Sequence, residues 1–214
     1  MKKIVVLTVL ALLIFTSSII AEEIIVRVQD YELTETEFLE TSERMRSELD
    51  APEEATDADI DMYITNAIVE DFIINSLIRI DIEERGVEAT KEEVDQEMDQ
   101  LIQDIIENQD IDSKDEAFEH IEAISGLSEE DIREQAGENI SFVKLQLYYM
   151  EKAQEELNSI DMEAEYEKYL EEVDDPMAFE EFTESVLAQK TNDLLQERIN
   201  YLYEQKEEYI EINL

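Results

Sequence analysis

Few residues in this chain are of types that perform catalysis or bind transition metals. His120 is the only histidine, and the 214 residues include no cysteine. A zinc-type site would therefore need carboxylate ligands alone, so we interpret His120 as a solvated side chain on a short helix. The lack of cysteine also excludes a disulfide framework and thiol catalysis within this sequence.

The run from Asp110 to Asp115 is superficially similar to a calcium-binding loop. Lys114 stands where the loop needs an oxygen ligand, and Asp115 stands where its sharp turn requires glycine. We therefore exclude an EF-hand. Calcium binding at this surface would be weak and not specific, and we predict no metal site.

Carboxylates are too numerous to identify an active site. The chain carries 59 Asp and Glu residues, and no two of them stand apart as the differently tuned pair that a glycosidase needs. It has no glycine-rich phosphate loop, no G-x-S-x-G elbow and no H-E-x-x-H motif. The sequence predicts a protein that is not an enzyme and uses no cofactor.

The charge balance limits the classes of partner. With 16 Lys and Arg residues, the formal net charge is −43, which repels nucleic acid and anionic lipid. Two interpretations remain open: solubility in a salty environment, and attraction of basic client proteins. The acidic residues are spread along the whole chain, which favours the first interpretation.

The first 21 residues predict export. Lys2 and Lys3 precede an apolar run over residues 4–15, and small residues follow up to Ala21. This pattern is typical of a secretory signal peptide. Residues 4–21 also approach the ~18 residues of a membrane span, so an uncleaved N-terminal anchor is the alternative. Either way, we expect residues 22–214 to form one domain in the periplasm or at the cell exterior, with no membrane insertion beyond the leader.

The rest of the chain predicts a mainly α fold with a strand at each end. Residues 24–28 and 209–214 have strand patterns, and residues 29–32 read as a turn. Only helical patterns lie between them, so we expect an elongated helical domain in which the two end strands pair in a small two-stranded sheet. Such a ribbon is marginal alone and must lie against the helices.

Capping signals divide the helical part. Thr34 with Glu37 and Thr90 with Glu93 form capping boxes, and Gly86 suits the left-handed residue that ends a helix. The helix before Gly86, over residues 59–85, is apolar on most sides, which predicts burial by other elements. A further helix is predicted after the cap at Thr90, with an apolar stripe from Val94 to Ile105. Others are predicted over residues 115–124, 128–157, 161–170 and 179–202.

Aromatic and methionine side chains are the remaining candidates for a binding surface. Ordinary core packing explains each of them, but a concave apolar lining for varied partners would use the same residue types. Phe142, Tyr149 and Met150 can share one face of their helix. The candidate peptide-binding residues are Phe38, Met45, Phe142, Tyr149, Met150 and Tyr201.

The order of these segments resembles that of extracytoplasmic chaperones of the SurA/PrsA type, whose peptide-binding domain is similar to the trigger-factor C-terminal domain. The resemblance is carried by the strand and capping box at residues 25–38, by residues 69–78 and 83–94, by the loop and cap at residues 126–134, and by the last helix and strand. It covers residues 24–214. Residues 171–176 directly join two helices between which that family often inserts a parvulin isomerase domain.

The resemblance implies a holdase-like chaperone without prolyl isomerase activity. Its partners would be unfolded or newly secreted polypeptides, bound without nucleotide or cofactor. The alternative is a non-catalytic assembly module that binds one folded partner or forms a homodimer.

Overall fold

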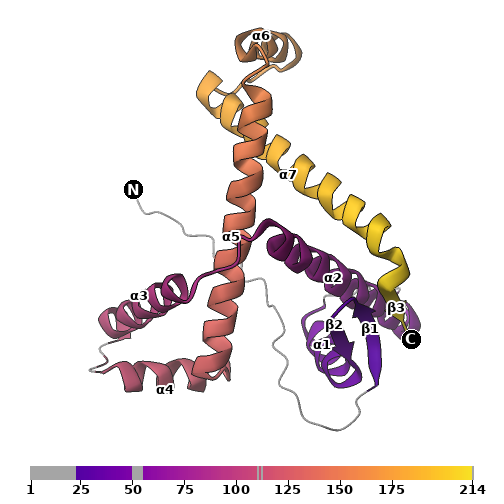
Figure 1. Ribbon diagram of the computed structural model, residues 1–214, viewed down its shortest axis with the longest axis vertical. Coiled ribbons are helices and arrows are strands. Elements are labelled where there is room, and N and C mark those ends of the chain that lie inside the picture. Colours follow the sequence, from indigo (N-terminus) through magenta and orange to yellow (C-terminus); the bar gives the residue numbers. More distant parts are fainter. Residues whose placement is uncertain (1–22, 50–54, 110, 112, 214) are drawn as a thin grey trace. The chain divides into compact units, whose positions relative to one another are not determined.

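The computed structural model describes residues 23–49, 55–109, 111 and 113–213. The expected leader, residues 1–21, lies outside this range, as do residues 50–54 of the first linker. The described chain is mainly α with one small antiparallel sheet, which confirms the predicted class (Figure 1). Its helices are α1 (Glu35–Glu48), α2 (Asp57–Arg85), α3 (Lys91–Gln109), α4 (Lys114–Ser125), α5 (Glu129–Leu157), α6 (Met162–Glu172) and α7 (Phe179–Lys206).

The described residues fall into two compact units. The first, the α3–α4 unit, comprises Thr90–Glu138. The second, the sheet unit, comprises Glu23–Ala89 and Asn139–Leu214. Helix α5 contributes its first turns to the α3–α4 unit and the remainder to the sheet unit.

The α3–α4 unit has its own apolar core. Met98 and Ala117 are fully buried, from α3 and α4 respectively, and Ile102, Ile121 and Ile132 pack with them. Arg133 forms an ion pair with Asp95 at 2.6 Å on the surface of this core. His120 is half-buried on α4.

Three strands form the sheet of the second unit in the order β2-β1-β3. The predicted pairing of the two ends is confirmed, because β1 (Ile24–Val28) lies antiparallel to β3 (Ile210–Ile212). The other neighbour, β2 (Tyr31–Thr34), was expected to be part of a turn. The turn is only Gln29–Asp30, where Gln29 adopts a positive φ of 56°, and the next four residues return along β1.

Local signals define both ends of α2. Thr56 and Asp59 form a capping box, so the helix begins two residues before the expected start. Gly86 takes the left-handed conformation with φ 65°, and its amide donates to the carbonyls of Ile82 and Glu83. Leu77 is fully buried, and Ile64, Ile68 and Ile80 almost so, as the apolar pattern on most sides predicted.

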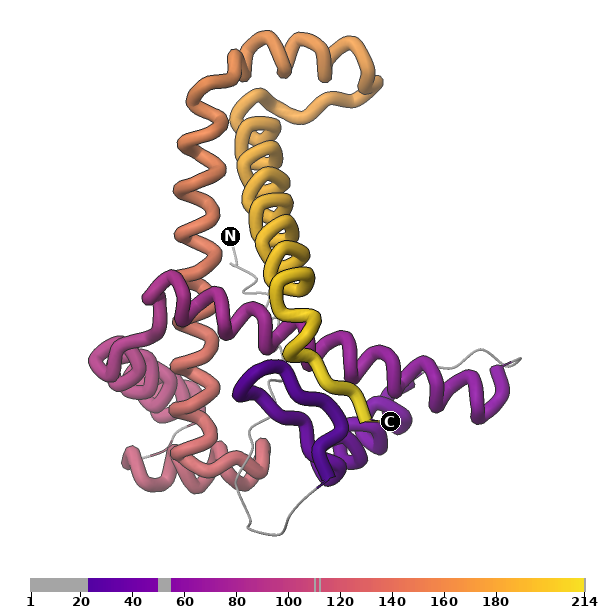
Figure 2. The backbone as a smooth tube through the Cα atoms, turned by 45° about the vertical axis from the view of Figure 1, so that its right-hand side comes forward, coloured from indigo at the N-terminus to yellow at the C-terminus, as the bar shows by residue number. Residues whose placement is uncertain are grey.

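One apolar cluster of the sheet unit joins helices α2, α5 and α7. Leu145 of α5 is fully buried, and Ile82 of α2 and Tyr149 of α5 pack with it, while Leu194 and Leu195 of α7 cover them. Figures 1 and 2 show α7 running back alongside the end of α5 near α6, then leading into β3. No helix within the described residues is both long enough and apolar enough to cross a membrane.

Candidate functional site

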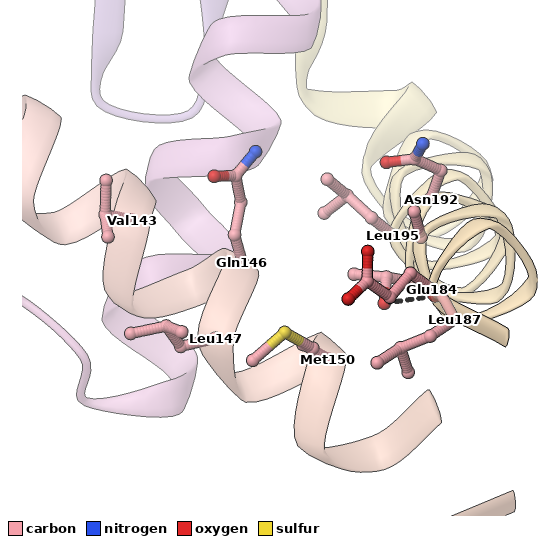
Figure 3. Close-up of a pocket in the computed structure, with 10 residues that line it drawn as sticks. Val143, Gln146, Leu147, Met150, Glu184, Leu187, Asn192 and Leu195 are labelled. Carbon is pink, nitrogen blue, oxygen red and sulfur yellow. Dashed lines mark hydrogen bonds between the residues drawn. The ribbon is translucent and has the colours of Figure 1, made fainter. Parts of the chain in front are cut away.

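The sheet unit contains an open groove between α5 and α7 (Figure 3). The space has a volume of about 350 Å³. Both walls are helical, so the positions that line it recur at intervals of three and four residues. The lining residues are Val143, Gln146, Leu147, Met150, Glu184, Leu187, Ala188, Thr191, Asn192 and Leu195.

The α5 wall presents an apolar surface to solvent. Val143 is 51% exposed, Leu147 48% and Met150 39%, and the three lie on one face of the helix. Scattered exposed apolar residues are normal on a protein surface, but a row of three inside a concave site is typical of a binding surface. Leu187 and Leu195 supply the opposite wall and are half-buried.

Four polar side chains line the same space. Gln146 comes from α5, whereas Glu184 and Asn192 come from α7. The hydroxyl of Thr191, by contrast, donates to the carbonyl oxygen of Leu187 at 2.8 Å and is satisfied within its own helix. The groove therefore combines apolar walls with amide groups that can hydrogen-bond a peptide backbone, which is the usual composition of a peptide or ligand site.

A buried charged network ties both walls of the groove to α2. Asp81 of α2 is 0% exposed. Its Oδ1 accepts a hydrogen bond from Nε of Arg198 on α7 at 2.6 Å, and its Oδ2 accepts one from the hydroxyl of Tyr149 on α5 at 2.6 Å. One carboxylate thus fixes the helix behind the groove to the two helices that form it.

Further cationic contacts complete this network. Arg85 lies one helical turn from Asp81, at 3.3 Å, and its guanidinium lies over the ring of Tyr148 and beside that of Tyr149. Arg198 also pairs with Glu84. Because each charge in the network has a partner, the cost of burying Asp81 is offset, and the three helices are held in one arrangement.

An aromatic cluster holds α6 against the start of α7. Tyr166 and Tyr169 of α6 stack with ring centroids 6.0 Å apart, and both contact Phe182. The hydroxyl of Tyr166 donates to the carbonyl oxygen of Met177, and the amide of Met177 donates to the hydroxyl of Tyr169. These contacts fix the loop before α7, although no residue of α6 is fully buried.

The pKa of Tyr149 is raised, first by burial and then by its hydrogen bond to the Asp81 carboxylate. A raised pKa means that the folded state holds the phenolic proton more tightly than the unfolded state, whose pKa is about 10. The resulting stabilisation is complete below pH 10 and is lost as pH rises above it.

We therefore expect the free energy of unfolding to fall as the pH rises above 10. The fall should be less steep in Tyr149→Phe, because this variant lacks the titrating hydroxyl. The difference between the two slopes should correspond to at most about one linked proton. Urea denaturation at a series of pH values measures the slope. Tyr201→Phe, on the exposed surface of α7, is the control and should follow the original slope. Identical slopes for Tyr149→Phe and the original chain would contradict the expectation.

The structure separates most of the six candidate residues predicted from the sequence. Only Met150 lines the groove. Tyr149, which was expected to share its face, is buried against Asp81, and Phe142 is half-buried outside the lining. Phe38 and Met45 are half-buried on α1, and Tyr201 is exposed beside Arg198.

Sequence reasoning missed most of the groove. Val143 and Leu147 belong to the apolar stripe of their helix, and such a stripe has the same spacing whether another helix covers it or not. Asp81 was also missed. The available signal was an acidic residue between Ile80 and Ile82 in a helix apolar on most sides, a position that requires a buried partner.

Comparison with known proteins identifies no relative of this chain. No family model matches the chain, and neither a curated protein nor a solved structure does. In the part of the chain that the structure describes, no group of three or more His, Cys, Asp or Glu side chains is arranged to hold a metal ion.

Proposed function

We propose that the protein is an extracytoplasmic holdase-like chaperone that binds unfolded or newly secreted polypeptides. The observation that carries the proposal is the open groove between α5 and α7, in which Val143, Leu147 and Met150 expose apolar surface. Transient burial of a client's apolar side chains there would keep them from aggregating. The resemblance to SurA/PrsA-type chaperones and the pattern of residues 1–21 support the same proposal.

The chemistry of the groove suits clients of varied sequence. Methionine and leucine side chains adapt to different partners, and Gln146 and Asn192 can hydrogen-bond main-chain groups that every polypeptide carries. The formal charge of −43 keeps a complex with an aggregation-prone client in solution. Binding and release need no nucleotide, and prolyl isomerase activity is not part of the proposal.

The test is suppression of the aggregation of a denatured exported protein, followed by light scattering at equimolar chaperone in low and high salt. We expect suppression that is retained in high salt, because burial of apolar surface is not screened. Unchanged scattering would exclude a holdase. Capture of a single folded partner at fixed stoichiometry would instead support an assembly module.

The double variant Leu147→Ser/Met150→Ser should require about tenfold more protein for the same suppression. Removing two apolar side chains from the groove costs about 1.4 kcal/mol or more of client binding. The matched control is Leu39→Ser/Met62→Ser, which makes the same changes on α1 and α2 at residues that are 52% and 61% exposed and do not line the groove. Equal losses in both double variants would contradict the assignment of the groove.

A further inference from the structure

The groove carries one acidic side chain that stands apart from its apolar walls. Glu184 lines the space from α7, and Figure 3 shows its carboxylate directed away from that helix toward the groove. Within the described chain no cation is paired with it. The nearest lysine along the helix, Lys190, is paired with Glu156 of α5 at 2.8 Å.

The surroundings of Glu184 increase its attraction for a cation. Glu180 and Glu181 lie one turn earlier on the same helix, so three carboxylates are neighbours on this part of α7. Apolar walls lower the local dielectric, which strengthens a short contact between opposite charges relative to one in open solvent. A cation seated there would neutralise charge that the chain itself leaves unbalanced.

These charges also restrict the class of occupant. A second copy of the chain would bring its own Glu184 and a further formal charge of −43 to the same surface, and the two copies would repel each other. An unfolded segment with a Lys or Arg among apolar residues fits better, because it satisfies the walls and the carboxylate together. The amides of Gln146 and Asn192 can then pair with its backbone.

We propose that the groove preferentially binds extended apolar segments that contain a Lys or Arg, and that Glu184 pairs with this cation. The inference rests on the proposed chaperone function and names the chemistry of its clients. Apolar burial provides most of the affinity, and the ion pair selects among segments of similar hydrophobicity. The acidity of the chain would then have a recognition role at this one place, whatever its role elsewhere on the surface.

The experiment measures binding of three dye-labelled peptides to the full chain by fluorescence anisotropy. The peptides share a leucine-rich extended sequence and differ only in a central Lys, Gln or Glu. We expect the Lys peptide to bind about two- to fivefold more tightly than the Gln peptide, which is the range of a partly exposed ion pair. The Glu peptide should bind more weakly than either, and the differences should shrink in 1 M salt.

The decisive variant is Glu184→Gln, which should bind the Lys and Gln peptides equally. Glu204→Gln is the control, because it removes the same charge from an exposed position on α7 that does not line the groove. It should keep the preference for the Lys peptide. An unchanged preference in Glu184→Gln, or an equal loss in both variants, overturns the inference, since the general field of the protein would then explain it.

The remaining outcomes distinguish this inference from the proposed function. Equal binding of all three peptides, abolished by Leu147→Ser/Met150→Ser, would overturn the cation preference and leave the chaperone proposal standing. Absence of peptide binding together with unchanged light scattering would overturn both. A dimer in sedimentation that the same double variant dissociates would show that a second copy occupies the groove, and it would also overturn the inference.

Discussion

Replacing Asp81 with alanine is expected to lower the free energy of unfolding of the sheet unit by about 3 kcal/mol. The carboxylate is 0% exposed and serves three partners, namely Arg198, Arg85 and the hydroxyl of Tyr149. Its removal leaves two guanidinium groups beside an empty acceptor site, and the buried hydroxyl of Tyr149 loses its acceptor and keeps only the contact from Nη2 of Arg85. The loss is placed at the lower end of the range for buried pairs because Arg198 keeps Glu84.

The measurement is urea denaturation followed by circular dichroism, with hydrogen exchange of α2, α5 and α7 as a local readout. A loss of 3 kcal/mol corresponds to a fall in Tm of about 6–12 °C for a protein of this size. Glu70→Ala is the matched control, since it removes one charge from an exposed position on the same helix and should change stability by less than about 0.5 kcal/mol. A loss below 1 kcal/mol in Asp81→Ala would contradict the role given to the network.

The pairing of Asp81 with Arg198 can be separated from simple loss of packing. In a double-mutant cycle, Asp81→Ala/Arg198→Ala should destabilise the unit by less than the sum of the single variants, because the second change removes the guanidinium that has lost its buried acceptor. The effect should also persist in 1 M salt, since buried pairs are screened much less than exposed ones. If the losses of stability in the two single variants add up to the loss in the double variant, the two side chains act independently.

The Asp81 network also links stability to the groove. Arg198 belongs to the helix that carries Glu184 and Leu187, and Tyr149 belongs to the helix that carries Leu147 and Met150. The width of the groove changes when either α5 or α7 shifts. The Asp81 network connects both of these helices to α2 through polar contacts. Asp81→Ala is therefore expected to weaken client binding as well, although Asp81 itself does not line the site.

Local signals in the sequence predicted much of the fold. The capping box of Thr34 and Glu37 and the left-handed Gly86 appear in the structure as expected, because caps are satisfied by residues three or four positions away. The second strand was missed because Gln29 and Asp30 lack the Asn-Gly or Asp-Gly signature of a tight hairpin. A glutamine at positive φ is uncommon, so the sequence indicated a turn at residues 29–32 but not the two-residue turn of a hairpin.

The candidate site was less predictable because it depends on contacts between distant segments. Asp81 and Arg198 are 117 positions apart, and nothing in either local pattern identifies the other as its partner. The same limit applies to Leu147. Its helical stripe was visible in the sequence, but the position of α7 decides which part of that stripe is covered and which part lines a groove.

Deleting residues 209–214 is expected to expose only one edge of β1. The carbonyl of Ile25 accepts from the amide of Asn213 at 2.8 Å, and the amide of Gln29 donates to the carbonyl of Tyr209 at 3.3 Å. Backbone groups alternate between the two neighbours of a strand, so Arg27 also faces β3, whereas Val26 and Val28 face β2. The amides of Arg27 and Gln29 should therefore exchange at least about tenfold faster after the deletion.

The same strand supplies the control for this experiment. The amides of Val26 and Val28 should keep most of their protection, because they bond to β2 and both side chains are fully buried. Glu211→Gln is the matched variant. It removes the ion pair with Arg27 but keeps the strand, so it should leave exchange in β1 unchanged. Uniform acceleration along β1 would mean that β3 is needed for the whole sheet to form. Unchanged exchange at Arg27 and Gln29 would contradict the pairing of the two ends, and with it the closed arrangement that returns α7 to the start of the chain.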